Sequence, residues 1–396
     1  MPRSRAKAPP RLTRDAERLI ALALGLNASG SLTEDRFWEN EMSALVAKLL
    51  ENGNDAPIDG ALDHLYQTNL GAYDTLIELV ENESESVTAM QGDRAWQALL
   101  IAAPIVAWSK YAIPSGPIAR DESDALRVQL QAHVLADGAR INLVPYLYSI
   151  DQLPRHFSEL RRLAARLADA AITGEVPRMD LARLPETAHL LADTRFLVAC
   201  AAVPRGGALF RWQEDASGHA GRAGSLQEWI AQARPTLSKL LPGCVFECLL
   251  PDAYYVNCRE SDRRVRPFGI RAAISFLENA LKVKAGELQA VVAGFGEERV
   301  DEYRVGFCLP NETAEVAHGV VWPLYGREDE TARPGPLDEV LSQLAECGVT
   351  EVKKLSGTFT PEYCEDCGAP LFANGEGEIV HAELPEEADT HTAHFH

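Results

Sequence analysis

The chain has 396 residues, of which 46% are hydrophobic and 24% are charged, as in ordinary globular proteins. This length exceeds what one ordinary hydrophobic core organises, so two or three domains are expected. The formal net charge of −20 argues against broad binding to duplex DNA or to an anionic membrane, because phosphate contacts need Lys and Arg.

Charge is unevenly distributed along the chain. Residues 1–12 form a basic arm with no acidic residue, whereas residues 361–396 hold nine Asp or Glu and no Lys or Arg. The arm is expected to be a solvated terminus, and contact with an anionic partner such as RNA is the alternative. The acidic tail is expected to be a solubilising surface.

A soluble, cytoplasmic protein is expected. The longest apolar run, 98–108, has 11 residues and contains Pro104, whereas a membrane span needs about 20. Near the start of the chain, the spacing predicts an amphipathic helix of the mature protein rather than a secretory signal. Eight cysteines in this length do not make a disulfide scaffold.

Residues 13–90 are predicted to be a helical region. Ser31 and Glu34 form an S-x-x-E capping box ahead of apolar residues at helical spacing, and Gly53 ends that pattern. Further helices are expected near residue 57 and around 73–80.

Two α/β units are predicted next, over 95–175 and 190–360. The first contains expected strands at 98–108 and 141–148 and expected helices at 123–135 and 154–171. The second opens with strands at 196–203 and 244–250 and helices at 226–241 and 268–281. The recurring order suggests an internal duplication.

The second unit continues with three closely spaced strands. Short connections between 288–295, 303–309 and 316–324 predict an antiparallel meander, followed by a helix at 336–347 and a strand at 352–359. The predicted fold class is therefore α/β or α+β, behind a helical N-terminal region.

Residues 361–396 carry the most specific pattern in the chain. Two thiolates in Cys364-Glu-Asp-Cys367 can hold one tetrahedral ion, and Gly368 permits the tight turn beneath it. A strand at 370–372, a turn at 374–377 and a returning strand at 378–381 complete a hairpin that looks like a zinc ribbon. Zinc is the expected cofactor, and the site is expected to be structural.

The remaining zinc ligands stay open at this point. His391 and His396 are spaced H-x4-H, His391 and His394 are spaced H-x2-H, and His381 is a third option. The histidines could also come from a second chain. The alternatives are a reduced C-x-x-C without metal, and a catalytic zinc with water as its fourth ligand. Thioredoxin-like redox chemistry is disfavoured because Pro370 comes too soon for a following helix.

A second candidate site is a cluster of arginines ahead of the helix expected at 268–281. The guanidinium group of arginine can donate two parallel hydrogen bonds to the oxygens of a phosphate or a carboxylate, and the start of a helix presents free N–H groups. The predicted anion-binding residues are Arg259, Arg263, Arg264 and Arg266. The alternative is a solvated loop whose arginines pair with the surplus acids of the chain.

The chain resembles an uncharacterised bacterial family known only as a domain of unknown function. The residues that carry this resemblance are the run 98–108, Ile113–Gly116, Pro145–Tyr148, the arginine-rich stretch leading to Phe268 and Gly269, and the Cys364–Cys367 motif with the histidine-rich end. The resemblance covers nearly the whole chain and implies a bacterial, cytoplasmic protein, but no activity. Zinc ribbons more often have four cysteines, and this chain lacks the second pair.

The function expected from these patterns is a non-enzymatic binding or regulatory protein. Its partner is expected to be a protein rather than a nucleic acid, given the charge. The alternative is an enzyme acting on a phosphorylated or carboxylated small molecule, with the arginines as an anion clamp. No HExxH, GxSxG, P-loop or kinase signature is present in the sequence.

Overall fold

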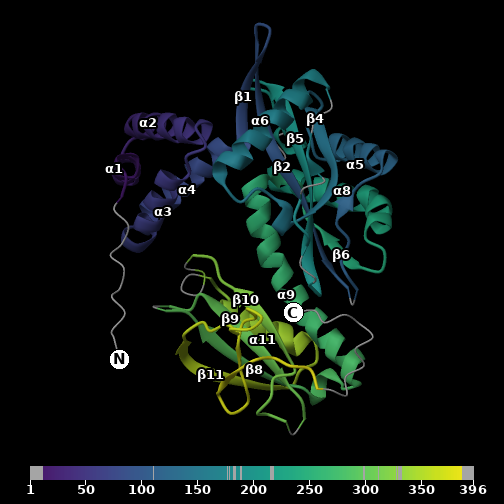
Figure 1. Cartoon of the computed structure of the whole chain (residues 1–396). Helices are drawn as coiled ribbons and strands as arrows, with labels where there is room; N and C mark the ends of the chain where they lie inside the picture. The colour runs from purple at the N-terminus through teal and green to yellow at the C-terminus, as the bar shows by residue number, and fades with distance from the viewer. Residues whose placement is uncertain are drawn as a thin grey trace.

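A computed structural model describes residues 12–385, except 110, 176, 178, 182–183, 188–189, 215–217, 298, 311, 327 and 329–331. It has a mixed α/β architecture, which confirms the predicted fold class. Figure 1 shows a helical N-terminal group beside a large sheet, and a smaller sheet below them. Within the described residues, no helix is long and apolar enough to cross a membrane.

Four helices form the N-terminal group and share one apolar core. They are α1 (Arg14–Ala28), α2 (Leu32–Glu51), α3 (Ala56–Thr68) and α4 (Leu70–Glu85). The predicted cap is confirmed, because the Ser31 side chain accepts a hydrogen bond from the Glu34 amide at the start of α2. The expectation of helix up to residue 90 is wrong at its end, since residues Ser86–Gln91 form strand β1.

The large sheet is antiparallel and has the strand order β1-β2-β5-β4-β3, with β6 and β7 also paired to β2. Its other strands are β2 (Arg94–Trp108), β3 (Gly116–Pro117), β4 (Arg140–Ser149), β5 (Ala192–Pro204), β6 (Val245–Cys248) and β7 (Asp252–Ala253). Strands from both predicted α/β units thus pair in one sheet; the internal duplication stays a prediction.

Helices cover both faces of this sheet, which explains the unbroken apolar run of β2. Alternate residues of β5 point to opposite faces, so that Leu197 packs under α5 (Arg120–His133) and α8 (Gly218–Leu240), whereas Val198 packs under α6 (Phe157–Thr173). A four-residue helix, α7 (Arg211–Glu214), precedes α8. Both faces of the sheet are therefore shielded from water, and β2 does not need to alternate apolar with polar residues.

The smaller sheet has the order β10-β9-β8-β11. The strands β8 (Gln289–Phe295), β9 (Glu302–Cys308) and β10 (His318–Pro323) form the predicted antiparallel meander, and β11 (Glu351–Phe359) joins parallel to β8. One face packs against the long helix α9 (Tyr254–Leu281) and α11 (Pro336–Glu346). The other face is covered by the C-terminal hairpin, β12 (Phe372–Ala373) and β13 (Ile379–Val380).

Helix α9 connects the two sheets, as Figure 1 shows. Its first residue, Tyr254, belongs to the core of the large sheet, whereas Ile270, Ile274 and Leu277 belong to the core of the smaller one. The prediction that this helix begins at residue 268 is wrong, because α9 starts at Tyr254 and contains Pro267 in its interior. Proline lacks the N–H that a continuous helix needs, which is why the sequence pattern suggested a boundary there.

Candidate metal centre and adjoining pocket

A tight turn brings the two cysteines of the C-terminal motif together. The amide of Gly368 donates to the carbonyl of Cys364 at 2.9 Å, and the amide of Cys364 donates to the carbonyl of Ala369 at 2.8 Å. Gly368 has a φ of 73°, in the left-handed region that glycine adopts without strain. The turn therefore depends on glycine at this position, as the motif predicts.

The same turn favours the thiolate form of Cys364. Backbone hydrogen bonds from Cys367 and from Asp366, in that order of size, lower the pKa of the Cys364 thiol. Donors aimed at a sulfur stabilise its negative charge. A thiolate is the form in which cysteine binds a metal ion.

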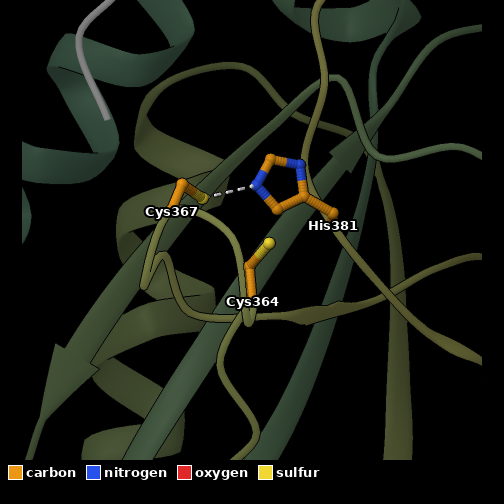
Figure 2. A group of neighbouring side chains, drawn as sticks. All are labelled: Cys364, Cys367 and His381. Atoms are coloured by element: carbon orange, nitrogen blue, oxygen red, sulfur yellow. Dashed lines mark hydrogen bonds between the residues drawn. The ribbon is translucent and has the colours of Figure 1, made fainter.

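His381 supplies a third donor from the end of the hairpin's returning strand. Its Nε2 lies 3.2 Å from the Sγ of Cys367, and Figure 2 shows the imidazole ring facing the two cysteines. The next residues are fixed to the connection between β9 and β10: Ala382 bridges Val316, and the amide of Glu383 donates to the Val316 carbonyl at 2.8 Å. The position of His381 is thus set by backbone pairing.

The second ring nitrogen of His381 lies beside a carboxylate. Its Nδ1 is 3.3 Å from an Oε1 of Glu383, although the two atoms are not aligned as a hydrogen bond. Histidines that bind metals commonly direct the other ring nitrogen to a carboxylate, which fixes the ring orientation and raises the basicity of the ligating nitrogen. Glu383 lies at the distance for this role, at 3.3 Å, but not at the angle that a hydrogen bond needs.

Cys364, Cys367 and His381 could hold a metal ion, because their ligand atoms all lie within 4.8 Å of one another. Bond lengths typical of zinc, in a tetrahedral arrangement, place sulfur and nitrogen ligands about 3.6 Å apart. The sulfur–nitrogen distance of 3.2 Å between Cys367 and His381 is close to this value. Two thiolates and an imidazole form a donor set that suits zinc.

The predicted tail ligands His391, His394 and His396 lie outside the described residues. The structure thus joins His381, which the sequence offered only as the third option, to the two predicted cysteines. A hairpin between the cysteines and His381 carries the chain back to its starting point, and the turn at 374–377 was the signal for this return.

The hairpin packs closely on the smaller sheet because two glycines leave room for it. A Cβ on Gly319 would lie 2.2 Å from the ring of Phe372, and a Cβ on Gly306 would lie 2.7 Å from the carbonyl oxygen of Ala373. At the turn of the hairpin, the buried Asn374 accepts hydrogen bonds from the amides of Glu376 and Glu378. The turn that holds the two cysteines is thus followed by a hairpin with its own apolar contacts to the smaller sheet.

A buried arginine fixes the base of the turn that holds the cysteines. The guanidinium of Arg304 is fully buried and donates to the carbonyls of Glu362 at 2.8 Å and Leu371 at 2.6 Å, on either side of the turn. Its charge is matched by Glu302, whose carboxylate accepts from Nε at 2.6 Å. Arg304 thereby ties both strands of the turn to β9, a role that the sequence did not indicate.

The four predicted anion-binding arginines all lie within α9 rather than ahead of a helix start. The free N–H groups of that start are at Tyr254, so they do not contribute to a site near Arg263. Three of the four have a carboxylate partner in the chain. The pairs are Arg259 with Glu81, Arg264 with Glu260 at 2.9 Å, and Arg266 with Glu328 at 3.0 Å; Arg263 is exposed. A shared anion site for the four stays a prediction.

A pocket of about 650 Å³ adjoins the candidate metal centre. Two of the three ligand residues, Cys367 and His381, line it, and Arg266 lines it from α9. The remaining walls are mainly apolar and come from residues before β5, from α9, from β10 and from the hairpin. They include Leu190, Leu191, Val265, Val320, Val321 and Phe372. The pocket has the size of many small-molecule sites, roughly 300–1,000 Å³.

Comparison with known proteins places the chain in one family. The model of the family described as "Protein of unknown function (DUF2863)" matches residues 4–395. The chain belongs to this family. No curated protein and no solved structure matches it. The family carries no activity to transfer, so the features of this DUF2863 protein that bear on its function are the candidate metal centre and the adjoining pocket.

Proposed function

We propose that this DUF2863 protein binds one zinc ion through Cys364, Cys367 and His381, and that it acts as a binding or regulatory protein. The observation that carries the proposal is the convergence of two thiols and an imidazole within 4.8 Å. Zinc with sulfur and nitrogen ligands gains its preferred tetrahedral geometry there.

The surroundings of the three residues support a site built before the ion binds. The turn is closed by backbone hydrogen bonds, and Arg304 and the hairpin hold its base. Zinc would then join the turn to the returning strand at His381, which adds a cross-link between 364 and 381. A protein partner remains a prediction from the acidic composition, and a cytoplasmic location remains a prediction from the lack of a long apolar run and from the amphipathic spacing near the start of the chain.

The alternative of an enzyme with a four-arginine anion clamp has less support. Arg259, Arg264 and Arg266 each lie against a glutamate, so their charge is matched before any substrate arrives. An anion would have to displace these carboxylates.

Metal analysis of the purified full-length chain tests the proposal. We expect about one zinc per chain, loss of the metal in Cys364→Ser and Cys367→Ser, and at least a tenfold weaker affinity in His381→Ala. Cys244→Ser removes a half-buried thiol outside the cluster and serves as the matched control. Full retention of zinc by a variant that carries both Cys364→Ser and Cys367→Ser would exclude the site.

A second comparison addresses the tail. The triple variant of His391, His394 and His396 to Ala retains zinc if His381 is the essential imidazole ligand. Loss of zinc from this variant, together with full retention by His381→Ala, would transfer the role to the tail as the sequence first suggested.

A further inference from the structure

The pocket beside the metal centre has an unusual polar lining for so acidic a protein. The chain carries a net charge of −20, yet none of the described residues that line the pocket is Asp or Glu. Its polar groups are Arg266, His318 and the two metal ligands Cys367 and His381. An electron-rich ligand would therefore meet no carboxylate on the wall.

Arg266 brings a guanidinium to the pocket, and its Nε has no acceptor among the described residues. Glu328 accepts from both terminal nitrogens of its guanidinium, at 3.1 and 3.0 Å. Its Nε is buried without a hydrogen-bond partner in the part of the chain that the structure describes, and the side chain is only 1% exposed. Arg266 therefore gives the pocket wall a cationic side chain, although its two terminal nitrogens are already held by Glu328.

A metal ion at the candidate centre would offer a second binding point, because it would accept a further ligand. Among the described residues, Cys364, Cys367 and His381 provide three ligands, whereas zinc prefers four. Zinc sites with three protein ligands keep the fourth position for water or for a bound molecule. Because Cys367 and His381 both line the pocket, an ion held by them lies at its wall.

We infer that this pocket binds a small apolar carboxylate, whose head group takes the fourth coordination position of the metal and whose hydrocarbon part lies against Val320, Val321 and Phe372. The inference rests on the proposed metal site. It assigns to the DUF2863 protein a ligand class, and it makes the zinc part of a small-molecule receptor rather than a purely structural ion.

Cobalt substitution tests the inference on the full-length chain. Co²⁺ in a site with two thiolates has visible absorption bands that respond to a change of its fourth ligand. Titration with acetate, butyrate, hexanoate and octanoate should shift these bands. The dissociation constant should fall roughly fourfold for each added methylene, until the pocket is filled.

A pocket-filling substitution separates the pocket from the metal. Gly269 lines the pocket from α9, and a Cβ there would make only an ordinary contact, 3.4 Å from Val320. We expect Gly269→Leu to weaken hexanoate binding at least tenfold while acetate binding changes less than twofold. Gly269→Ala is the matched control and should leave both unchanged. The chain-length series on the unaltered protein needs no variant, so it holds whether or not Gly269→Leu folds.

The possible failures are distinct. A protein that takes up no Co²⁺ refutes the proposed function itself. Bands that appear but ignore every carboxylate, or that respond equally to acetate and octanoate, refute the pocket ligand and leave metal binding intact. If carboxylates act only after deletion of residues 386–396, the tail occupies the fourth position and the inference is overturned.

Discussion

Glu85 makes the stability of this protein depend on pH in a calculable way. Its carboxylate, at the end of α4, accepts a hydrogen bond from the Tyr255 amide at 2.9 Å, in the first turn of α9. Burial raises the pKa of Glu85 from 4.5 to about 7, and the hydrogen bond from Tyr255 opposes that rise only in part. The residue is 4% exposed, so the carboxylate has little access to water.

The sign follows from proton binding in the two states. Below pH 4.5 both the folded and the unfolded chain hold the proton on Glu85. Between pH 4.5 and 7 the unfolded chain releases it while the folded chain retains it, so the unfolding free energy falls by about 1.4 kcal/mol per pH unit. A pKa displaced from 4.5 to about 7 corresponds to about 3 kcal/mol of lost stability above pH 7.

Glu85→Gln tests this reasoning, because glutamine keeps the acceptor for the Tyr255 amide and cannot ionise. The unfolding free energy of the variant minus that of the parent should rise from near zero at pH 4.5 to about 3 kcal/mol at pH 8. Urea unfolding at several pH values measures this difference, and Asp74→Asn, an exposed change on the same helix, is the control. A difference that stays constant from pH 5 to pH 8 would refute the argument.

Three further substitutions test how the elements are held together. Arg304→Met removes three hydrogen bonds of a buried guanidinium and should lower the free energy of unfolding by about 3–5 kcal/mol. It should also speed amide hydrogen exchange in the C-terminal hairpin, and unchanged exchange there would count against the role of Arg304. Gly319→Ala forces the Phe372 ring to move and should cost about 1–3 kcal/mol by thermal denaturation, a cost that Phe372→Leu in the same chain should reduce. Asp55→Ala leaves the Ser158 amide at the start of α6 without its acceptor at 2.9 Å; we expect a loss of about 1–2 kcal/mol in urea unfolding, and a neutral result would show that water replaces the carboxylate.

Much of the fold was predictable because its elements are local. The N-cap at Ser31, the strand at 98–108 and the three-strand meander each follow from short-range patterns, and all three are present. The Ser31 amide, however, donates to the Ser29 hydroxyl, so the reciprocal bond of a full capping box is not formed. Pairing was not predictable to the same degree. Strand β5 joins β2 over thirteen residue pairs, and the apolar sequence of both strands is compatible with many partners and registers.

The start of α9 shows where local rules mislead. Pro267 predicts a helix boundary, and the charged stretch before it has no apolar stripe, yet the helix continues through both. Burial of Asn257, which donates to the carbonyls of Ala102 and Leu250, and the ion pair of Arg259 with Glu81 hold the first half of the helix in place. These contacts join residues distant in sequence, so tertiary structure decides the outcome.

The candidate metal centre also has one part that local sequence predicts and one part that tertiary structure decides. The C-x-x-C-G turn is a local motif, and its two cysteines lie with His381 in a group that could hold a metal ion. The approach of His381 to the cysteines depends on the register of the hairpin and on the bridge of Ala382 to Val316, which no local pattern contains. The pocket is assembled from four separate parts of the chain, so the sequence alone could not indicate it.

Helix α9 has a mechanical consequence. Its 28 residues span about 42 Å, and the two ends are embedded in different hydrophobic cores. Arg266 and Gly269, on the wall of the pocket, flank Pro267, where the backbone lacks one hydrogen bond and bends most easily. A change in the bend of α9 at Pro267 would therefore alter the angle between the two cores in which its ends are embedded.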